Sequence, residues 1–378
     1  MRRRFAVPAV IGSVLSLAAV SGCPVEPVTP DPGAPTFVVS TVISGQVNPW
    51  DIAWTPDGTM LFTERPGRIN AMVGGAKRVL ADPVDAVNTS EGGTLGLAVD
   101  PDFATNRRIF VCFESNISGA LDERVASYVV DAGFTTLTGR SDIVTGIPLN
   151  TSGQAGRHSG CRLAFGPDGY LYVTTGDAVR SDTAQNPTSL GGKVLRVSTT
   201  GAGAPGNPGG ALDARIYTLG HRNPQGIAFR PGDGAGFSIE QGTGCDDEVN
   251  LLAAGANYGW NPGAAGFYNE NAPMTDTGSV PGAVAAKWSS GCPTIATSGG
   301  GFVTGVQWGS WNGALIAAAL AGNQLRVLHF DGAGNLTSQS TALTDRGRLR
   351  TIKQGPNGHL YVLTDSSSGS ILELTPTP

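Results

Sequence analysis

The chain has 378 residues, of which 55 are glycine, and only 15% of its residues are charged. This composition, together with the lack of any long 3.6-residue apolar period, argues against a helical protein and favours many short strands joined by tight turns. The net charge is −5 and basic residues cluster only at the extreme N-terminus, which argues against nucleic-acid binding.

The N-terminus predicts export. Residues 1–22 combine three arginines with an apolar stretch and end in small residues directly before Cys23, which resembles a bacterial lipobox. We therefore expect a lipoprotein signal peptide, a lipid on the Cys23 sulfur, and anchoring in the bacterial cell envelope, with ordinary signal cleavage as the alternative. Residues 23–36 hold five prolines and are expected to form a semi-rigid tether, which leaves residues 37–378 for the folded domain.

One motif recurs six times along the domain: an apolar strand, a Pro-Asp-Gly-like turn and a second apolar strand. In such a turn proline fixes φ, aspartate bonds the local backbone and glycine accepts a positive φ. Repetition of this hairpin predicts an all-β fold, a six-bladed β-propeller of four-stranded antiparallel blades. The copies occupy residues 49–69, 95–113, 162–178, 226–242, 302–320 and 349–365.

Four cysteines lie in the domain: Cys112, Cys161, Cys245 and Cys292. An even number in an exported chain indicates two disulfides, for which three pairings are possible. We favour Cys112–Cys161 and Cys245–Cys292, because each pair lies on neighbouring repeats. A zinc site is the weaker interpretation, since the sequence contains no CxxC spacing.

Polar residues concentrate in four segments between the strands: residues 90–96, residues 157–162 with 175–177, residues 220–226, and residues 240–250 with 255–260. Their motifs include EGGTLGLAVDPDF, HSGCRLAFGPDG, GHRNPQGIAF and DDEVNLLAAGANYGW. In this order they resemble the soluble glucose/sorbosone dehydrogenases, over nearly the whole domain. That family uses pyrroloquinoline quinone (PQQ) and Ca²⁺. The resemblance implies oxidation of an aldose sugar at C1 to the lactone, with electrons passed to an external acceptor.

The resemblance implies a catalytic role for three residues. His158 lies in a Gly/Ser loop before a strand, where a histidine can accept the sugar hydroxyl proton near neutral pH. Asp177 corresponds to the acid that orients this base, and Arg222 to the cation that stabilises charge on the quinone oxygen. A structural histidine, a turn aspartate and an internal salt bridge are the respective alternatives.

Other residues match positions that hold the cofactor and the metal. The resemblance implies that Glu91, Asn223, Gln241 and Thr294 contact the cofactor, that Arg348 and Arg350 clamp the PQQ carboxylates, and that His158 and Arg222 also bind the cofactor. The carbonyl groups of Gly242 and Thr243 match ligands of the catalytic Ca²⁺, and Asp247, Glu248 and Tyr258 match a second, structural calcium site. Without a metal, these acidic residues would form a solvated turn.

Some positions depart from the glucose-dehydrogenase branch and favour the smaller aldose-sugar-dehydrogenase type. Arg157 replaces an acid before the base, Cys292 replaces an aromatic residue, and Ala321 stands where that branch has lysine. Two other functions remain open. One is a non-catalytic surface propeller that binds a glycan or a protein. The other is a calcium-dependent lactonase, which would need several carboxylates converging on one ion in the channel.

Overall fold

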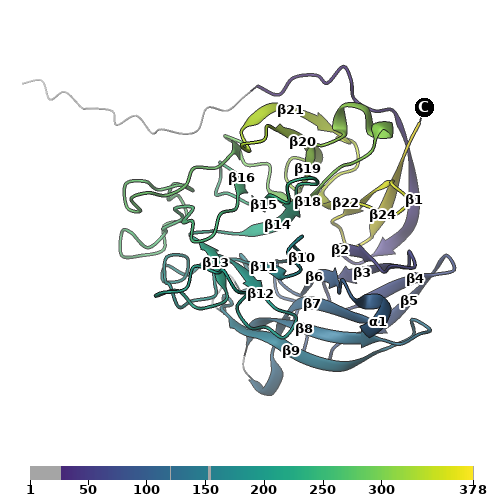
Figure 1. The fold of residues 1–378 in the computed structure, drawn as a ribbon, viewed down its shortest axis with the longest axis horizontal. Coiled ribbons are helices and arrows are strands. Elements are labelled where there is room, and N and C mark those ends of the chain that lie inside the picture. The colour runs from purple at the N-terminus through teal and green to yellow at the C-terminus, as the bar shows by residue number, and fades with distance from the viewer. Residues whose placement is uncertain (1–26, 120, 152–154, 378) are drawn as a thin grey trace, which may run out of the picture.

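The structure is a computed structural model that describes residues 27–119, 121–151 and 155–377; the predicted signal peptide and Cys23 lie outside the described residues. Six four-stranded antiparallel sheets are arranged radially about a central axis (Figure 1). The prediction of a six-bladed β-propeller is therefore confirmed.

The strands follow one another blade by blade. The first three blades are β2 (Pro49–Trp54), β3 (Met60–Glu64), β4 (Ile69–Val73), β5 (Ala76–Ala81); β6 (Thr94–Val99), β7 (Arg108–Ser115), β8 (Asp122–Val130), β9 (Leu137–Ile147); and β10 (Gly160–Phe165), β11 (Leu171–Thr175), β12 (Lys193–Val197), β13 (Ile216–Leu219). The last three are β14 (Pro224–Phe229), β15 (Gly236–Glu240), β16 (Glu248–Leu251), β17 (Trp288–Ser289); β18 (Thr297–Phe302), β19 (Leu315–Ala319), β20 (Gln324–Phe330), β21 (Leu336–Ala342); and β22 (Leu349–Gln354), β23 (Leu360–Thr364), β24 (Gly369–Pro376), β1 (Phe37–Gln46). The short helices are α1 (Phe103–Asn106), η1 (Ile117–Gly119) and η2 (Val306–Trp311).

The two ends of the domain close the ring. Strand β1 pairs antiparallel with β24, with Phe37 opposite Pro376, so the N-terminal strand becomes the outer strand of the last blade. The side-chain hydroxyls of Thr36 and Thr377 lie 2.6 Å apart and extend this pairing. Closure between distant parts of the chain fixes all six blades in one ring.

The hairpin turns use the chemistry that the sequence predicts. In the first blade the Asp57 carboxylate accepts hydrogen bonds from the Thr55 hydroxyl (2.5 Å) and the Thr59 amide (3.0 Å). Gly58 has a φ of 84°, a left-handed conformation that glycine adopts without steric cost. The turn therefore sets the register of the strands on either side.

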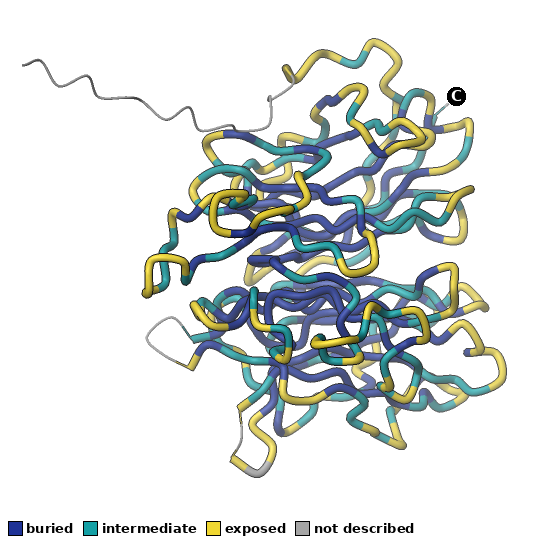
Figure 2. Tube along the Cα trace, turned by 60° about the vertical axis from the view of Figure 1, so that its left-hand side comes forward, coloured by how far each residue is buried: buried dark blue, intermediate teal, exposed yellow. Residues whose placement is uncertain are grey.

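The hydrophobic core lies between neighbouring blades. Phe110 and Val125 of the second blade pack with Leu163 and Val173 of the third, and all four are buried. Figure 2 shows buried strands inside the molecule and exposed loops at its margins. Because the blades are packed on their faces, the ends of the inner strands are held rigidly around the channel.

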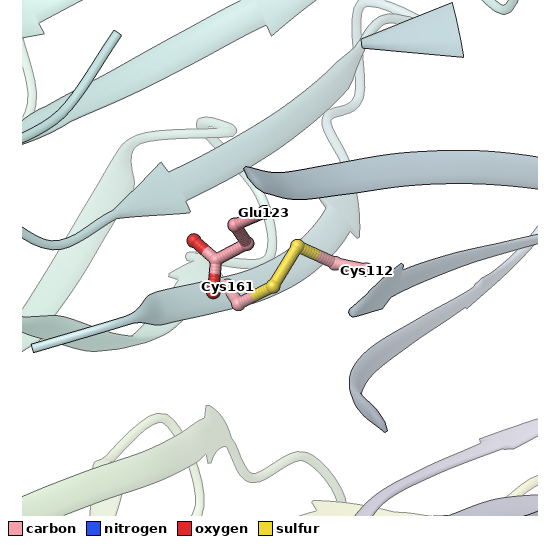
Figure 3. A group of neighbouring side chains, drawn as sticks. All are labelled: Cys112, Glu123 and Cys161. Carbon is pink, nitrogen blue, oxygen red and sulfur yellow. A yellow bond between two sulfur atoms is a disulfide. The ribbon is translucent and has the colours of Figure 1, made fainter. Parts of the chain in front are cut away.

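Both expected disulfides are present. Cys112–Cys161 joins β7 to β10 across two blades (Figure 3), and Cys245–Cys292 joins the loops that follow β15 and β17. The predicted pairing is confirmed.

The described part of the predicted tether lies against the fifth blade. The Thr29 amide donates to the Gln339 carbonyl (3.3 Å), and the Ser310 hydroxyl donates to the Asp31 carboxylate (2.6 Å). These bonds hold the described part of the tether on this blade, and the first strand begins at Phe37. No helix in the described ranges is long and apolar enough to cross a membrane.

Candidate active site

The two mouths of the channel differ in chemistry. The inner strands end in Trp54, Phe165, Phe229 and Phe302, which line an apolar hollow at one mouth. The opposite mouth is formed where the inner strands begin, and it carries the polar residues that the sequence singles out. Each of these residues lies just before the inner strand of a blade, within that strand, or just after the second strand of the blade. They are Glu91, His158, Asp177, Arg222, Asn223, Gln241, Thr294, Arg348 and Arg350.

His158 and Asp177 form a buried pair at this mouth. The β10–β11 hairpin brings His158 Nδ1 to 2.8 Å from Asp177 Oδ1, with side-chain exposures of 2% and 0%. A Cβ atom on Gly176 would lie 1.7 Å from the His158 carbonyl oxygen, so this close approach requires glycine. His158 itself has a φ of 56°, a conformation that is uncommon for a residue with a side chain. The local backbone is thus shaped around the histidine.

The Asp177 carboxylate is fully satisfied by donors. Its Oδ2 atom accepts hydrogen bonds from Trp260 Nε1 (2.6 Å) and from the Tyr268 hydroxyl (3.0 Å). Burial acts to raise the pKa of Asp177, but the nearby His158, the charge of Arg222 and the hydrogen bond from Trp260 hold that pKa below its usual value. Asp177 is therefore ionised, and it fixes the imidazole with Nδ1 toward the protein and Nε2 toward the mouth.

Arg222 lies beside this pair. Its Nη1 donates to the Gln241 carbonyl oxygen (3.1 Å), its Nη2 forms an ion pair with Glu270, and its side chain is 4% exposed. Its buried Nε atom has no hydrogen-bond partner among the described residues. A desolvated cation with a spare donor suits an anionic or carbonyl oxygen of a ligand.

Side-chain amides connect the base to the predicted clamp. Asn223 Nδ2 lies 3.2 Å from both Glu91 Oε2 and Gln241 Oε1, and the same Glu91 oxygen accepts the His158 amide at 3.2 Å. Gln225 continues the network, because its Nε2 donates to Gln241 (3.3 Å) and its Oε1 accepts from Arg350 (2.8 Å). The structure therefore joins His158, Glu91, Asn223, Gln241 and Arg350 in one chain of hydrogen bonds, with Gln225 as the link to Arg350.

Arg348 and Arg350 converge on one carboxylate. Their Nη2 atoms lie 3.3 Å and 2.9 Å from Asp365 Oδ2, and the side-chain exposures are 51% for Arg348 and 4% for Arg350. Burial lowers the pKa of Arg350, and its Nε has no partner among the described residues. Arg350 is thus held in place and Arg348 extends into solvent. Both guanidinium groups are positioned to donate hydrogen bonds to an anionic ligand at the mouth.

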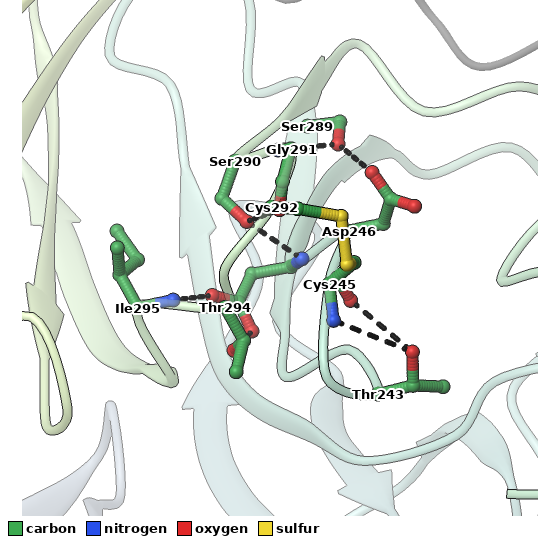
Figure 4. The surroundings of a disulfide bond; sticks show 10 residues. Thr243, Cys245, Asp246, Ser289, Ser290, Gly291, Cys292, Thr294 and Ile295 are labelled. Atoms are coloured by element: carbon green, nitrogen blue, oxygen red, sulfur yellow. Dashed lines mark hydrogen bonds between the residues drawn. A yellow bond between two sulfur atoms is a disulfide. The ribbon is translucent and has the colours of Figure 1, made fainter. Parts of the chain in front are cut away.

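The loop after β15 is organised by Asp247. Its Oδ1 accepts from the Gly242 amide (2.9 Å) and the Thr294 hydroxyl (2.8 Å), and its Oδ2 accepts from the Ile295 amide (2.7 Å). Figure 4 shows how the Cys245–Cys292 disulfide ties the same loop to the segment that carries Thr294. The Asp247 carboxylate is therefore used within the protein, and so is the proton of the Thr294 hydroxyl.

Two backbone oxygens of the same loop are unused within the described part of the chain. No donor there bonds to the carbonyl oxygens of Gly242 and Thr243. Carbonyl oxygens of this kind are typical ligands of Ca²⁺.

Glu248 and Tyr258 lie behind the mouth. Burial, reinforced by the negative charge of Glu240, raises the pKa of Glu248 to about 8. The Tyr258 hydroxyl bonds to the Leu251 carbonyl and its ring stacks on His221, so only its backbone could face a metal. His221 braces the loop, because its Nδ1 lies 2.8 Å from Glu240 Oε2.

The structure adds five residues to the site that the sequence does not assign. Gln225 and Asp365 bond to the predicted side chains, and Trp260, Tyr268 and Glu270 come from residues 252–287, the long excursion between β16 and β17. Trp260 belongs to the quoted GANYGW motif, which gave a signal, whereas Tyr268 and Glu270 stand in no recognisable pattern.

Comparison with known proteins places the chain in a family. The sequence profile described as Glucose / Sorbosone dehydrogenase matches residues 46–373. Aldose sugar dehydrogenase YliI of Escherichia coli is 32% identical over 357 residues, which cover 91% of this chain and 94% of that protein.

Solved structures of aldose sugar dehydrogenases are also similar to this protein. The apo-form of the soluble aldose sugar dehydrogenase from Escherichia coli has a TM-score of 0.81 at 30% identity and covers 90% of this chain and 100% of its own. The PQQ-bound aldose sugar dehydrogenase of Streptomyces coelicolor has a TM-score of 0.75 at 28% identity and covers 90% of this chain and 99% of its own. Because the profile spans most of the chain and the relatives match over nearly their whole length, this protein belongs to the glucose/sorbosone dehydrogenase family.

Proposed function

We propose that this protein is a PQQ- and calcium-dependent aldose sugar dehydrogenase that oxidises the sugar at C1 to the lactone. The observation that carries the proposal is the buried His158–Asp177 pair, 2.8 Å apart, with Arg222 beside it at one mouth of the channel. The names of the E. coli and Streptomyces relatives support the same activity.

The donor set at the mouth fits PQQ, a planar quinone that carries several carboxylates. Arg222 and Arg350 are buried cations, and each has an Nε atom without a partner among the described residues. Arg348 adds an exposed guanidinium. In this proposal these three arginines hold the anionic groups, while Glu91, Asn223, Gln241 and Thr294 complete the contacts. When bound, the quinone supplies the acceptor for the hydride that leaves C1.

His158 is the proposed general base. Its Nδ1 is held by Asp177, so the lone pair of Nε2 accepts the proton of the C1 hydroxyl while the C1 hydride and its electron pair leave the sugar. Asp177 stabilises the imidazolium that forms. Arg222 opposes the negative charge that develops on the accepting oxygen. An external acceptor then removes the electrons.

Calcium has two proposed places. The carbonyl oxygens of Gly242 and Thr243, which accept no hydrogen bond from the described residues, would hold the catalytic ion, and Asp247 supports their loop. At the second place, a cation would be bound by the buried carboxylate of Glu248, whose charge it would balance, and by the backbone of Tyr258. At the first place the ion would supply a Lewis acid, and at the second it would supply stability.

The chain is further proposed to work outside the cytoplasm, attached to the membrane through a lipid on Cys23. The lipobox-like sequence before Cys23 and the two disulfides support this placement.

Reconstitution tests the function. Purified cofactor-free protein is mixed with PQQ and Ca²⁺, and absorbance spectra are recorded before and after aldoses are added. We expect a bound-cofactor spectrum that bleaches with at least one aldose. A protein that never binds PQQ would instead favour a surface propeller that binds a glycan or a protein.

A further inference from the structure

Glu270 places a carboxylate among three basic groups of the site. Its Oε1 atom lies 3.0 Å from Arg157 Nη2 and 4.0 Å from His158 Nε2, and it also forms an ion pair with Arg222. None of these contacts is needed for the pairing of His158 with Asp177, which takes place on the other ring nitrogen.

A sugar must approach His158 past Glu270 and Arg157. The Nδ1 side of the ring is closed by Asp177 and Tyr268. On the Nε2 side, Arg157 Nη2 lies 3.2 Å away and Glu270 lies just beyond, with side-chain exposures of 28% and 39%. A base needs its substrate hydroxyl within about 3 Å, so the substrate has to occupy the space that these two side chains border.

The two side chains offer opposite chemistry to that substrate. Burial acts to raise the pKa of Glu270, but the charges of Arg222, His158 and Arg157 hold that pKa below its usual value, so the group is an anion. An ionised carboxylate only accepts hydrogen bonds, and a guanidinium only donates them. Sugar hydroxyls can satisfy both, whereas a sugar carboxylate would be repelled by Glu270 and attracted by Arg157.

We propose that Glu270 is a specificity-determining residue: it accepts a hydrogen bond from a hydroxyl of a neutral aldose and disfavours sugar acids, and Arg157 acts in the opposite direction. The inference rests on the proposed sugar oxidation. It assigns a role to the excursion between β16 and β17, and it gives a physical meaning to the arginine before the base.

The test compares glucose with glucuronate. In Glu270→Gln, the ratio of kcat/KM for glucuronate to that for glucose should rise by about tenfold or more, because one negative charge close to the substrate has been removed. The KM for glucose should rise, since one acceptor is weakened. Arg157→Gln should lower the same ratio. Asp233→Asn is the matched control. This exposed carboxylate lies in the turn after β14, at the end of the strand that is far from Arg222, so the substrate ratio should not change.

A second readout needs no turnover. Equilibrium titration of cofactor-free protein with glucuronate should give a dissociation constant about tenfold lower for Glu270→Gln than for the wild type. An active wild type whose substrate ratio and glucuronate affinity are both unchanged in Glu270→Gln would overturn this inference alone. A reconstituted wild type that oxidises no aldose would overturn the proposed function, and the sugar-specific role with it.

Discussion

The Nδ1 atom of His158 and the Oδ1 atom of Asp177 lie 2.8 Å apart, although the residues are 19 positions apart in the sequence. The hairpin β10–β11 joins them, and the glycine before Asp177 lets the two backbones touch. In a neutral imidazole only one nitrogen carries the proton, so donation from Nδ1 to Asp177 leaves Nε2 as the acceptor. The geometry therefore prepares the histidine for one proton transfer at one atom.

Asp177→Asn should slow cofactor reduction by roughly 10²-fold, because the base loses the carboxylate that orients it and stabilises its protonated form. PQQ affinity should stay within about twofold, since the proposed arginine clamp does not depend on Asp177. A variant that binds PQQ and reduces it as fast as the wild type would mean that Asp177 does not act on the base.

Removal of calcium should weaken cofactor binding and activity together. With a chelator present, the dissociation constant for PQQ should rise by on the order of tenfold or more, because the carbonyl oxygens of Gly242 and Thr243 would lose the proposed ion beside the cofactor. The chelator should also lower the unfolding temperature of the wild type, and it should do so less in Glu248→Gln, which weakens the second site. Glu373→Gln is the control for that variant, since Glu373 bonds to His359 and Tyr361 on the last blade. Identical PQQ titrations with and without chelator would contradict the metal assignment.

The disulfides give a prediction that does not depend on the chemistry. Thiol titration of residues 24–378, denatured without reductant, should detect none of the four cysteines. Replacing either pair by serine should cost about 2 kcal/mol, the lower end of the usual range for small secreted domains. Replacing Cys245 and Cys292 should in addition weaken PQQ binding, because that disulfide ties the calcium loop, whereas replacing Cys112 and Cys161 serves as the comparison. Two or more reactive thiols would contradict the pairing.

Glu114 predicts how stability depends on pH. It is buried in β7, and burial raises its pKa from 4.5 to about 7 despite hydrogen bonds from Thr89 and Ser159. Between these two values the folded state keeps the proton and the unfolded state releases it, so stability falls as pH rises through this window. Glu114→Gln is neutral throughout. The free energy of unfolding of the variant, relative to that of the wild type, should therefore increase between pH 4.5 and 7 by up to about 3 kcal/mol. Parallel curves, obtained by urea denaturation at several pH values, would contradict this.

Much of the fold could be predicted from the sequence because it is encoded locally. A turn such as that around Asp57 and Gly58 is specified by a few neighbouring residues, and six such turns define six blades. The pairing of β1 with β24 depends instead on residues that are more than three hundred positions apart, and no local sequence pattern predicts it.

The site residues also fall into a group that local sequence predicts and a group that it does not. His158, Asp177 and Arg222 flank the hairpins, so their positions follow once the blades are known. Tyr268 and Glu270 reach the base from an irregular excursion whose path is set by tertiary packing, for example by the buried Trp260 and Met274. Neither periodicity nor motif could place those two side chains.

The central claim is that His158 takes the hydroxyl proton in the step that reduces the cofactor, and single-turnover stopped-flow measurement of PQQ bleaching by an aldose tests it most directly. His158→Ala should bleach at least about 10²-fold more slowly than the wild type and bind PQQ with similar affinity, because the arginines and the calcium loop remain. His359→Ala, which removes a histidine paired with Glu373 away from the mouth, should bleach at the wild-type rate. A His158→Ala protein that binds PQQ and bleaches as fast as the wild type would contradict the account.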